Sequence, residues 1–357
     1  MTQQPGPSSS PPAKTKPTII LDSGAYSAWR LGKPIDLEKY CDWLEANIDW
    51  IGPYVALDVI GPNDSEAAAK ASYTNLVRMQ QRGLKPIPVW HAGEDVKWLY
   101  KMLDLGCDYI GLSASSLVTK HNVDDWYAYA WSHLVNADGL PTIKAHAFGE
   151  GRLSSLKRFP WYSADSTSWI YASQRNGQVN IEGNRRVAMR NDGLSERASP
   201  DVNLLPEMDK AVFNQLLHEL RIKPEVFNAP SKESTVLRTY MAAAYFLKIQ
   251  EAVRAIQPIR FHGQGFFAGG SNAKAIDVGQ FKFHLVIGNN PSAYCALAWA
   301  KHPFMLISYF YVVNSHMNTA ASHHRALEAF SKDPIQTCIE NPGLAAYWKT
   351  LQEYTYA

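Results

Sequence analysis

Acidic residues lie at the ends of three short apolar runs in the first half of the chain. Asp22 ends TIILD, Asp58 follows YVAL, and Asp165 lies in YSADSTSW, while His91 and His146 take similar places in VWHAG and KAHAFG. Several carboxylates in one place can supply a nucleophile and a general acid or base. In the alternative reading, roughly half of such aspartates only cap a helix or an Asx-turn. We favour a functional cluster, because neither Asp22 nor Asp58 is followed directly by a predicted helix start.

Short apolar runs alternate with amphipathic segments along most of the chain. The runs predict eight strands at 18–27, 54–60, 85–93, 109–115, 141–149, 162–169, 281–288 and 303–313. Strand and helix alternating in steps of about 25–35 residues are typical of βαβ units and a parallel sheet. The sequence therefore predicts an α/β fold, a (β/α)₈ TIM-type barrel with a large helical insertion between its sixth and seventh strands.

The same alternation of predicted strands and helices divides the sequence into four regions. Residues 1–17 are rich in Pro and Ser and are expected to be a disordered tail. Residues 18–169 hold strands one to six with the catalytic motifs, 170–278 form the insertion with a basic loop and helices, and 279–357 hold strands seven and eight with C-terminal helices. In such barrels the strands present catalytic side chains at their C-terminal ends, where the three aspartates are expected.

Composition bounds the possible partners and compartments. Of 357 residues 46% are hydrophobic, and 35 Lys and Arg against 33 Asp and Glu give a net charge of +2. A polyanion must then be bound by a local patch. The four cysteines are isolated, no secretory signal is evident, and no run of ~18 apolar residues occurs. We expect a soluble cytoplasmic protein with no membrane contact; its oligomeric state stays open.

The motifs, taken in order, resemble those of the tRNA-guanine transglycosylases. DSGAYS (22–27) is similar to DSGG[FY]Q, IGLSAS (110–115) to GLAVGE, and ADSTSW (164–169) to the strand that bears the nucleophile. ALDV, VWHAG and HAFGEG match further motifs, so that six motifs cover about 18–170. HAFG followed by ADSTSW is most similar to the phage and bacterial relatives that put 7-deazaguanines such as preQ0 into DNA. A phage-encoded chain would act in the host cytoplasm.

The resemblance implies exchange of a guanine in DNA for a 7-deazaguanine base. Asp165 would attack C1′ of the sugar and hold it covalently, and Asp22 would act as general acid and base. These are the two carboxylate roles of retaining glycosidases. Asp58 would accept hydrogen bonds from N1–H and the 2-amino group of the base. The target nucleotide must leave its stack to reach such a pocket.

Further residues are assigned to the base pocket by the same resemblance. Backbone N–H groups around Gly111 and Leu112 would donate to the base carbonyl, and Tyr26 and Phe148 would stack on the base. Ser23 and His91 complete the substrate-binding set. Alternatives remain: Tyr26 and Phe148 as ordinary core aromatics, His91 as a satisfied imidazole at a strand end, and His146 as a structural residue.

The chain also departs from the family. The tRNA enzymes carry a structural zinc on three clustered cysteines and a histidine, whereas no cysteine cluster occurs here, and His316, His323 and His324 are expected on an exposed helix. We therefore expect no metal and no other cofactor. The family's strand before DSGG is missing, and 303–313 can replace it as in a permuted barrel. Ser116 stands where GLAVGE has its acid, which favours a neutral nitrile-type incoming base.

A basic segment follows the nucleophile strand. NRRVAMRNDGLSER places Arg185, Arg186, Arg190 and Arg197 where they can bind phosphates of the nucleic acid, with a solvated loop as the alternative.

Three other functions stay open. The same exchange on tRNA, as in queuosine or archaeosine formation, is disfavoured by the missing zinc ligands. A non-catalytic nucleic-acid-binding subunit predicts loss of Asp22 or Asp165, and both are present. A barrel hydrolase would release the base without incorporating another.

Overall fold

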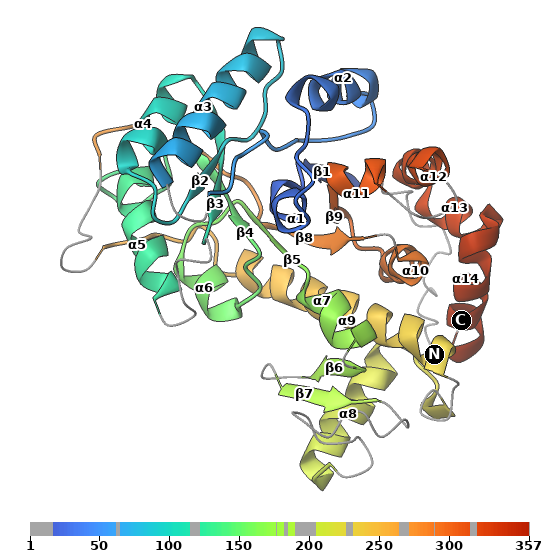
Figure 1. Ribbon diagram of the computed structural model, residues 1–357. Coiled ribbons are helices and arrows are strands. Elements are labelled where there is room, and N and C mark those ends of the chain that lie inside the picture. Colours follow the sequence, from blue (N-terminus) through green and yellow to red (C-terminus); the bar gives the residue numbers. More distant parts are fainter. Residues whose placement is uncertain are drawn as a thin grey trace, which may run out of the picture.

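The computed structural model describes residues 17–61, 65–114, 122–175, 177–181, 185–189, 205–225, 231–263, 271–288, 290–314 and 320–356. At its centre lies a curled parallel sheet of seven strands that forms a half-barrel, with helices around it (Figure 1). The strands in spatial order are β1 (Thr18–Asp22), β9 (Phe304–Ser308), β8 (Lys282–Ile287), β5 (Ser163–Ser166), β4 (Lys144–Phe148), β3 (Tyr109–Ser113) and β2 (Val89–His91). These are seven of the eight predicted strands, so the α/β class with a parallel sheet is confirmed.

The two faces of the sheet bury different residues. Alternate residues such as Ile19 and Leu21 belong to the large core beneath the helices, as do Ala145 and Ala147. The residues between them point to the inner face, because side chains alternate along a strand. A separate inner cluster joins Ile20, Val55, Val89, Leu306, Phe148 and Val286. Its members come from five strands and the segment before α3, so the sheet must curl for them to meet.

Residues 54–58 run alongside β1. Parallel bridges join Tyr54 to Leu21 and Val55 to Ile87. Val55 N–H donates to the Leu21 carbonyl at 2.9 Å, and Ala56 N–H donates to the Ile87 carbonyl at 2.8 Å. This segment therefore lies between β1 and the residues that lead into β2, where the predicted second strand belongs.

Crossover helices connect the strands outside the sheet. The helices are α2 (Leu37–Asn47), α3 (Ser65–Gln81), α4 (Val96–Asp104), α5 (Val123–Leu134), α6 (Leu153–Arg158) and α10 (Pro291–Ala300). Sequence signals set their starts: Asp36 accepts from Lys39 N–H at 3.0 Å, and Asp95 accepts from Lys97 N–H at 2.8 Å. Such caps satisfy amides that the first helical turn leaves unpaired.

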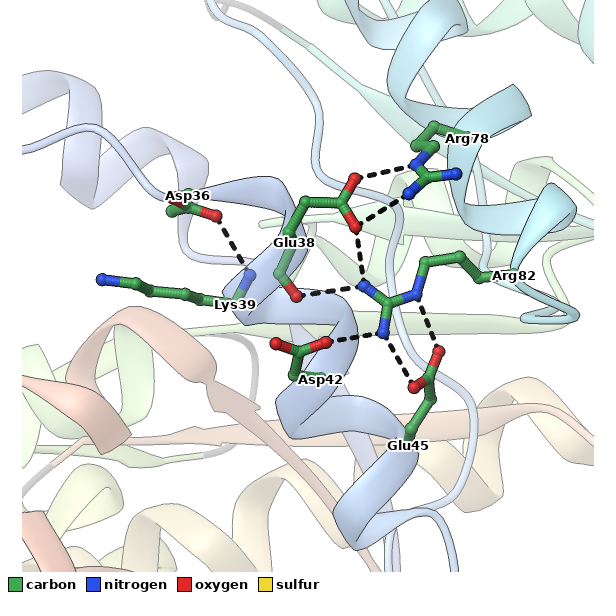
Figure 2. A network of polar contacts seen from close by, with 7 residues as sticks. All are labelled: Asp36, Glu38, Lys39, Asp42, Glu45, Arg78 and Arg82. Carbon is green, nitrogen blue, oxygen red and sulfur yellow. Dashed lines mark hydrogen bonds and ion pairs between the residues drawn. The ribbon is translucent and has the colours of Figure 1, made fainter.

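An ion-pair network joins the two helices on either side of residues 54–58 (Figure 2). Arg82, just after α3, contacts Glu38 at 2.8 Å, Asp42 at 2.6 Å and Glu45 at 2.8 Å, all on α2, and Arg78 contacts Glu38 at 2.7 Å. Single exposed pairs contribute little to stability, but a shared guanidinium with several carboxylates fixes the relative position of two helices. The network therefore helps to hold the segment that carries Asp58.

The segment between β5 and β8 holds a hairpin as well as helices. Its elements are α7 (Ser168–Ile170), the π-helix η1 (Tyr171–Arg175), the antiparallel strands β6 (Gln178–Ile181) and β7 (Arg185–Ala188), α8 (Glu207–Glu219) and α9 (Ser231–Arg254). The sequence did not predict this hairpin, since runs of four residues carry little periodic signal. Figure 1 shows the hairpin and α8 on the far side of α9 from the sheet.

Helix α9 is also a crossover helix of the sheet. It contacts β8, α6 and α10, and the Gln250 side chain accepts from Phe283 N–H at 3.0 Å. On the other side it contacts β6, and its buried Arg238 donates to the Ser173 carbonyl at 2.8 Å and to the Met189 carbonyl at 3.1 Å. The part of the insertion before α9 is thus fastened to the sheet through this helix.

Two predicted strands end earlier than expected. The chain turns after Asp22 into α1 (Ala25–Arg30) and after Ser308 into α11 (Tyr309–Val313). Gly24 makes the first turn with φ 79°, and a Cβ on it would lie 2.3 Å from Ser308 Oγ. Only glycine fits this position, because its backbone is left-handed and its neighbour is close. The two turns meet because β1 and β9 are parallel neighbours.

Three helices follow: α12 (Ala320–Lys332), α13 (Pro334–Glu340) and α14 (Pro342–Tyr354). The last two begin with Asp or Asn followed by Pro, which caps the first turn and supplies a suitable φ. None of the described helices has both the length and the apolar character needed to span a membrane.

Candidate active site

The predicted acidic residues meet at one end of the sheet. Asp22 is the last residue of β1, Asp165 is the third residue of β5, and Asp58 follows the bridged segment 54–55. Parallel strands bring their C-terminal ends to the same edge. The electrostatic influence of both Asp58 and Asp165 reaches Asp22, so the three carboxylates form one cluster.

Asp22 is arranged to carry a proton. Burial, and then the negative charges of Asp58 and Asp165, raise the pKa of Asp22 to about 8, although Gly24 N–H donates to its Oδ2 at 3.2 Å and acts in the opposite direction. At pH 7 this side chain is therefore mainly a neutral carboxylic acid. The expectation that no helix follows Asp22 directly was wrong: α1 begins three residues later, and the Gly24 bond is the Asx-type contact of the alternative reading.

Asp58 is held by two side chains, one on each of its carboxylate oxygens. Ser23 Oγ donates to Asp58 Oδ1 at 3.1 Å, and His91 Nε2 lies 3.0 Å from Asp58 Oδ2. Each carboxylate oxygen can accept two hydrogen bonds. Among the described residues each oxygen of Asp58 has one hydrogen-bond partner, so each keeps one acceptor position for a donor on another molecule. The Ser23 side chain was predicted to bind substrate, but it is fully buried and its hydroxyl bonds Asp58.

His91 lies between two carboxylates. Its Nδ1 lies 3.0 Å from Glu94 Oε1, and its backbone N–H donates to Glu94 Oε2 at 3.1 Å. Burial acts to lower the pKa of His91, but the hydrogen bonds to Asp58 and Glu94 outweigh it and raise the pKa to about 10. Both ring nitrogens must then donate, as only an imidazolium can.

This geometry favours the second of the two readings of His91. Both ring nitrogens are occupied by carboxylates, which leaves no ring nitrogen for the base, and the cation holds Asp58 in place. Glu94 was missed by sequence reasoning, although its signal exists: an acid three residues after a strand-end histidine can fold back onto it.

Asp165 forms hydrogen bonds to the protein through one of its two carboxylate oxygens. His146 Nε2 lies 3.1 Å from Asp165 Oδ1, and Gly149 N–H donates to the same oxygen at 3.0 Å. Asp165 Oδ2 has no hydrogen bond to any residue in the described part of the chain. The carboxylate is thus oriented through Oδ1, while Oδ2 is available for another molecule.

A buried chain of polar groups continues behind Asp165. His146 Nδ1 lies 2.5 Å from Ser163 Oγ, which in turn bonds the Tyr109 hydroxyl. Ser163 and His146 are fully buried, and Tyr109 is 8% exposed. Sequence reasoning missed Ser163 and Tyr109, but the signal was present: with Asp165 and His146 they occupy the inward positions of three adjacent strands.

The predicted role of Gly111 and Leu112 is not supported. Gly111 N–H donates to the Pro88 carbonyl at 2.8 Å, and Leu112 lies mid-strand with its side chain in the outer core. An amide that the sheet already uses cannot also bind the base carbonyl. Gly111 is needed because the Phe148 ring passes 2.3 Å from where a Cβ would stand.

Phe148 and Tyr26 differ in their surroundings. The Phe148 ring packs 4.5 Å from His146 between centroids and against the inner cluster, so it forms part of the floor of the site. Tyr26 is 55% exposed on α1, with its ring 5.9 Å from Trp29 and 5.8 Å from the Arg30 guanidinium. The alternative that Tyr26 is a core aromatic was wrong.

Exposed aromatic side chains form a rim beside the cluster of acids. Trp29 on α1 and Tyr311 on α11 are each 41% exposed, and Ser27 Oγ donates to the Tyr311 hydroxyl at 3.2 Å. Both helices begin where β1 and β9 end. We call Tyr26, Trp29, Arg30 and Tyr311 the aromatic rim.

Several predicted residues lie outside what the structure describes. Arg185 and Arg186 belong to β7, but their side chains are not described, nor are Arg190, Arg197, Ser116, His316 and residues 1–16.

The expected exposed histidine helix was wrong for His323. That residue is 5% exposed and bonds the Tyr294 hydroxyl at 3.1 Å, while His324 packs edge-on against Trp43 and Trp50. Within the described ranges, no group of three or more His, Cys, Asp or Glu residues is placed to hold a metal ion.

Comparison with known proteins finds no match: no family model fits the chain, and neither a curated protein nor a solved structure is similar to it.

Proposed function

We propose that this chain is a pentosyltransferase that exchanges a guanine in DNA for a 7-deazaguanine, of the nitrile (preQ0) type, through a covalent aspartyl–sugar intermediate. One observation carries the proposal. Three carboxylates lie at the C-terminal end of a parallel sheet, and their surroundings differ. Asp22 carries a proton at neutral pH, whereas Asp58 has a further acceptor position on each oxygen among the described residues. Asp165 has one oxygen without a hydrogen bond to the described part of the chain.

The proposed reaction uses these differences in order. Asp165 Oδ2 forms a bond to C1′ of the sugar while the C1′–N9 bond breaks, and the electron pair goes to the departing guanine. Asp22 gives its proton to that base and becomes a carboxylate. The incoming 7-deazaguanine then returns a proton to Asp22 as its ring nitrogen attacks C1′ and releases Asp165, which restores both acids.

Asp58 supports recognition of a guanine-type edge. Its two remaining acceptor positions match the adjacent N1–H and 2-amino donors of guanine and of a 7-deazaguanine. Adenine offers no donor at N1. His91 and Ser23 orient the carboxylate for this contact from behind.

The fold element that places Asp58 is part of the proposal. We infer that residues 54–58 are an eighth strand that closes the half-barrel into a TIM-type barrel. The bridges to β1 and to Ile87, together with Val55 in the inner cluster, support this closure. A closed barrel would set the three acids around one mouth.

A nucleic acid is the partner that the aromatic rim supports best. Bases stack on exposed aromatic rings with about 1–3 kcal/mol each, and an arginine beside them can pair with a phosphate. The choice of DNA over tRNA rests on the motif resemblance, and Arg185, Arg186 and Arg190 remain proposed phosphate contacts.

Incubation with labelled guanine and either duplex DNA or folded tRNA tests the proposal. We expect label to enter DNA and an excess of unlabelled 7-deazaguanine to compete it out. Label in tRNA alone would support base exchange but would show that the substrate is tRNA and not DNA. Release of guanine without incorporation would show a hydrolase and contradict base exchange.

Asp58→Asn tests base recognition. Loss of a charged acceptor should weaken binding of the free 7-deazaguanine base about 10- to 150-fold, measured by calorimetry, with little change in DNA affinity. Glu94→Gln is the matched control, because it changes the charge beside His91 without touching the base. We expect its effect to be several-fold smaller, and equal losses in both variants would make Asp58 a structural residue.

A further inference from the structure

The two histidines of the site have different partners. His91 faces a carboxylate with each ring nitrogen, whereas His146 faces the Asp165 carboxylate with Nε2 and the Ser163 hydroxyl with Nδ1. A hydroxyl can donate as well as accept, and a carboxylate only accepts. The protonation of His146 is therefore decided by the groups behind Ser163.

Proton counting favours a neutral His146. If Nδ1 carried a proton it would donate to Ser163 Oγ. Ser163 could then donate to Tyr109, which leaves the Tyr109 hydroxyl proton without an acceptor, or accept from Tyr109 as well, which leaves its own hydroxyl proton without one. In both cases one buried donor has no acceptor among the described residues, which is unfavourable. In the opposite direction, Tyr109 donates to Ser163, Ser163 donates to Nδ1, and Nε2–H donates to Asp165, so every donor has an acceptor.

The other described groups around His146 leave this count unchanged. Tyr109 approaches from β3, Asp165 from β5 and His284 from β8, with its ring centroid 6.0 Å away. Burial holds the pKa of His284 well below its usual value, so His284 is neutral. It bonds the Met305 carbonyl at 3.3 Å and not Asp165.

We propose that Tyr109 and Ser163 hold His146 as the neutral Nε2–H tautomer, and that His146 is a positioning residue that directs Asp165 to react through Oδ2. The second half rests on the proposed function. Because Nε2–H and Gly149 N–H both point at Oδ1, that oxygen is occupied in the free carboxylate and in the sugar ester alike. Only Oδ2 is left to form and break the bond to C1′.

Nitrogen NMR on protein labelled at histidine measures the tautomer without any activity. At pH 6–8 we expect His146 to show a protonated Nε2 and an unprotonated Nδ1, whereas His91 shows two protonated nitrogens in the same spectrum. His146→Gln and His91→Gln assign the signals. Two protonated nitrogens at His146, or a proton on Nδ1 alone, would overturn the proposal.

Ser163→Ala tests the role in catalysis. Without the hydroxyl, Nδ1 loses the group that donates to it and the ring is fixed only through Nε2. Oδ1 of Asp165 is then held less firmly, so kcat for exchange should fall about 3- to 10-fold, with KM for the base unchanged. Ser166→Ala is the matched control, since it removes a buried hydroxyl from the same strand that bonds Ser168 and not His146. We expect the control to keep the wild-type kcat, and an equal kcat in both variants, or a loss in Ser163→Ala that falls on KM alone, would contradict the positioning role.

The two measurements separate this inference from the proposed function. A neutral Nε2–H tautomer in a protein that exchanges no base would uphold the proton arrangement and reject the function. A charged His146 in a protein that does exchange base would reject the inference and keep the function.

Discussion

Asp165→Asn is expected to end both base exchange and formation of a covalent protein–DNA adduct, with kcat lowered by roughly 10³-fold or more. The amide oxygen can still accept from His146 and Gly149, so the fold around the site should be kept while the nucleophile is lost. The adduct is measured as denaturant-resistant DNA on a gel, after mixing protein with DNA in the absence of an incoming base.

Asp104→Asn provides the control for this experiment. Asp104 ends α4, is exposed, and lies far from the C-terminal ends of the strands, so activity and adduct should match the wild type. An adduct that persists in Asp165→Asn would place the nucleophile elsewhere, with Asp22 as the next candidate.

Asp22→Asn is expected to act in opposite directions on activity and on stability. Exchange should fall about 10²- to 10⁴-fold, because the departing base loses its proton donor. In the wild type the rate should also decline above about pH 8, where Asp22 loses its proton. Stability should rise in the variant, because an amide in this place is never charged.

The sign of the stability effect follows from the raised pKa of Asp22. Between the usual value of 3.8 and about 8 the folded state binds more protons than the unfolded state, so the free energy of unfolding falls as pH rises through this window. Each pKa unit corresponds to about 1.4 kcal/mol. The Tm of Asp22→Asn should therefore exceed that of the wild type by an amount that grows from pH 5 to pH 8.

Thermal unfolding at several pH values, with Asp104→Asn as the control, measures this difference. A constant difference across the range would show that Asp22 is already ionised at pH 5. That result would remove Asp22 as the acid of the proposed reaction.

The central sheet was accessible to sequence reasoning because parallel strands are buried on both faces. Runs such as YIGLS and KFHLVI are nearly continuous in apolar residues, and helical patterns of clear period separate them. The ends were less accessible: Tyr309–Val313 is as apolar as the strand before it, yet it forms helix α11. Periodicity does not separate short buried helices from strands, and the close contact between Gly24 and Ser308 that shapes these turns joins residues almost 300 apart in the chain.

The position of each acid and histidine along its strand could be predicted from the sequence, but the side chains that it contacts could not. Asp22, Asp58, His91 and Asp165 were placed at strand ends by their motifs, and the structure brings them to one edge. The contact of Glu94 with His91 and that of Ser163 with His146 depend on rotamers and on strand register, which a single sequence does not specify. The role predicted for Gly111 failed for another reason. Its amide was expected to bind the base carbonyl, but it already donates to the Pro88 carbonyl within the sheet.

Helix α9 couples the stability of the central sheet to that of the hairpin in the insertion. Its central residues Ala242, Ala243 and Phe246 are buried, and it touches both β8 of the sheet and β6 of the hairpin. Hairpin residues such as Val179 and sheet residues such as Phe283 belong to one continuous hydrophobic core with this helix, so one part cannot unfold while the other stays folded. The hairpin and the half-barrel should therefore denature in a single cooperative transition, and a protease that cuts the hairpin region should do so only as fast as the whole chain opens.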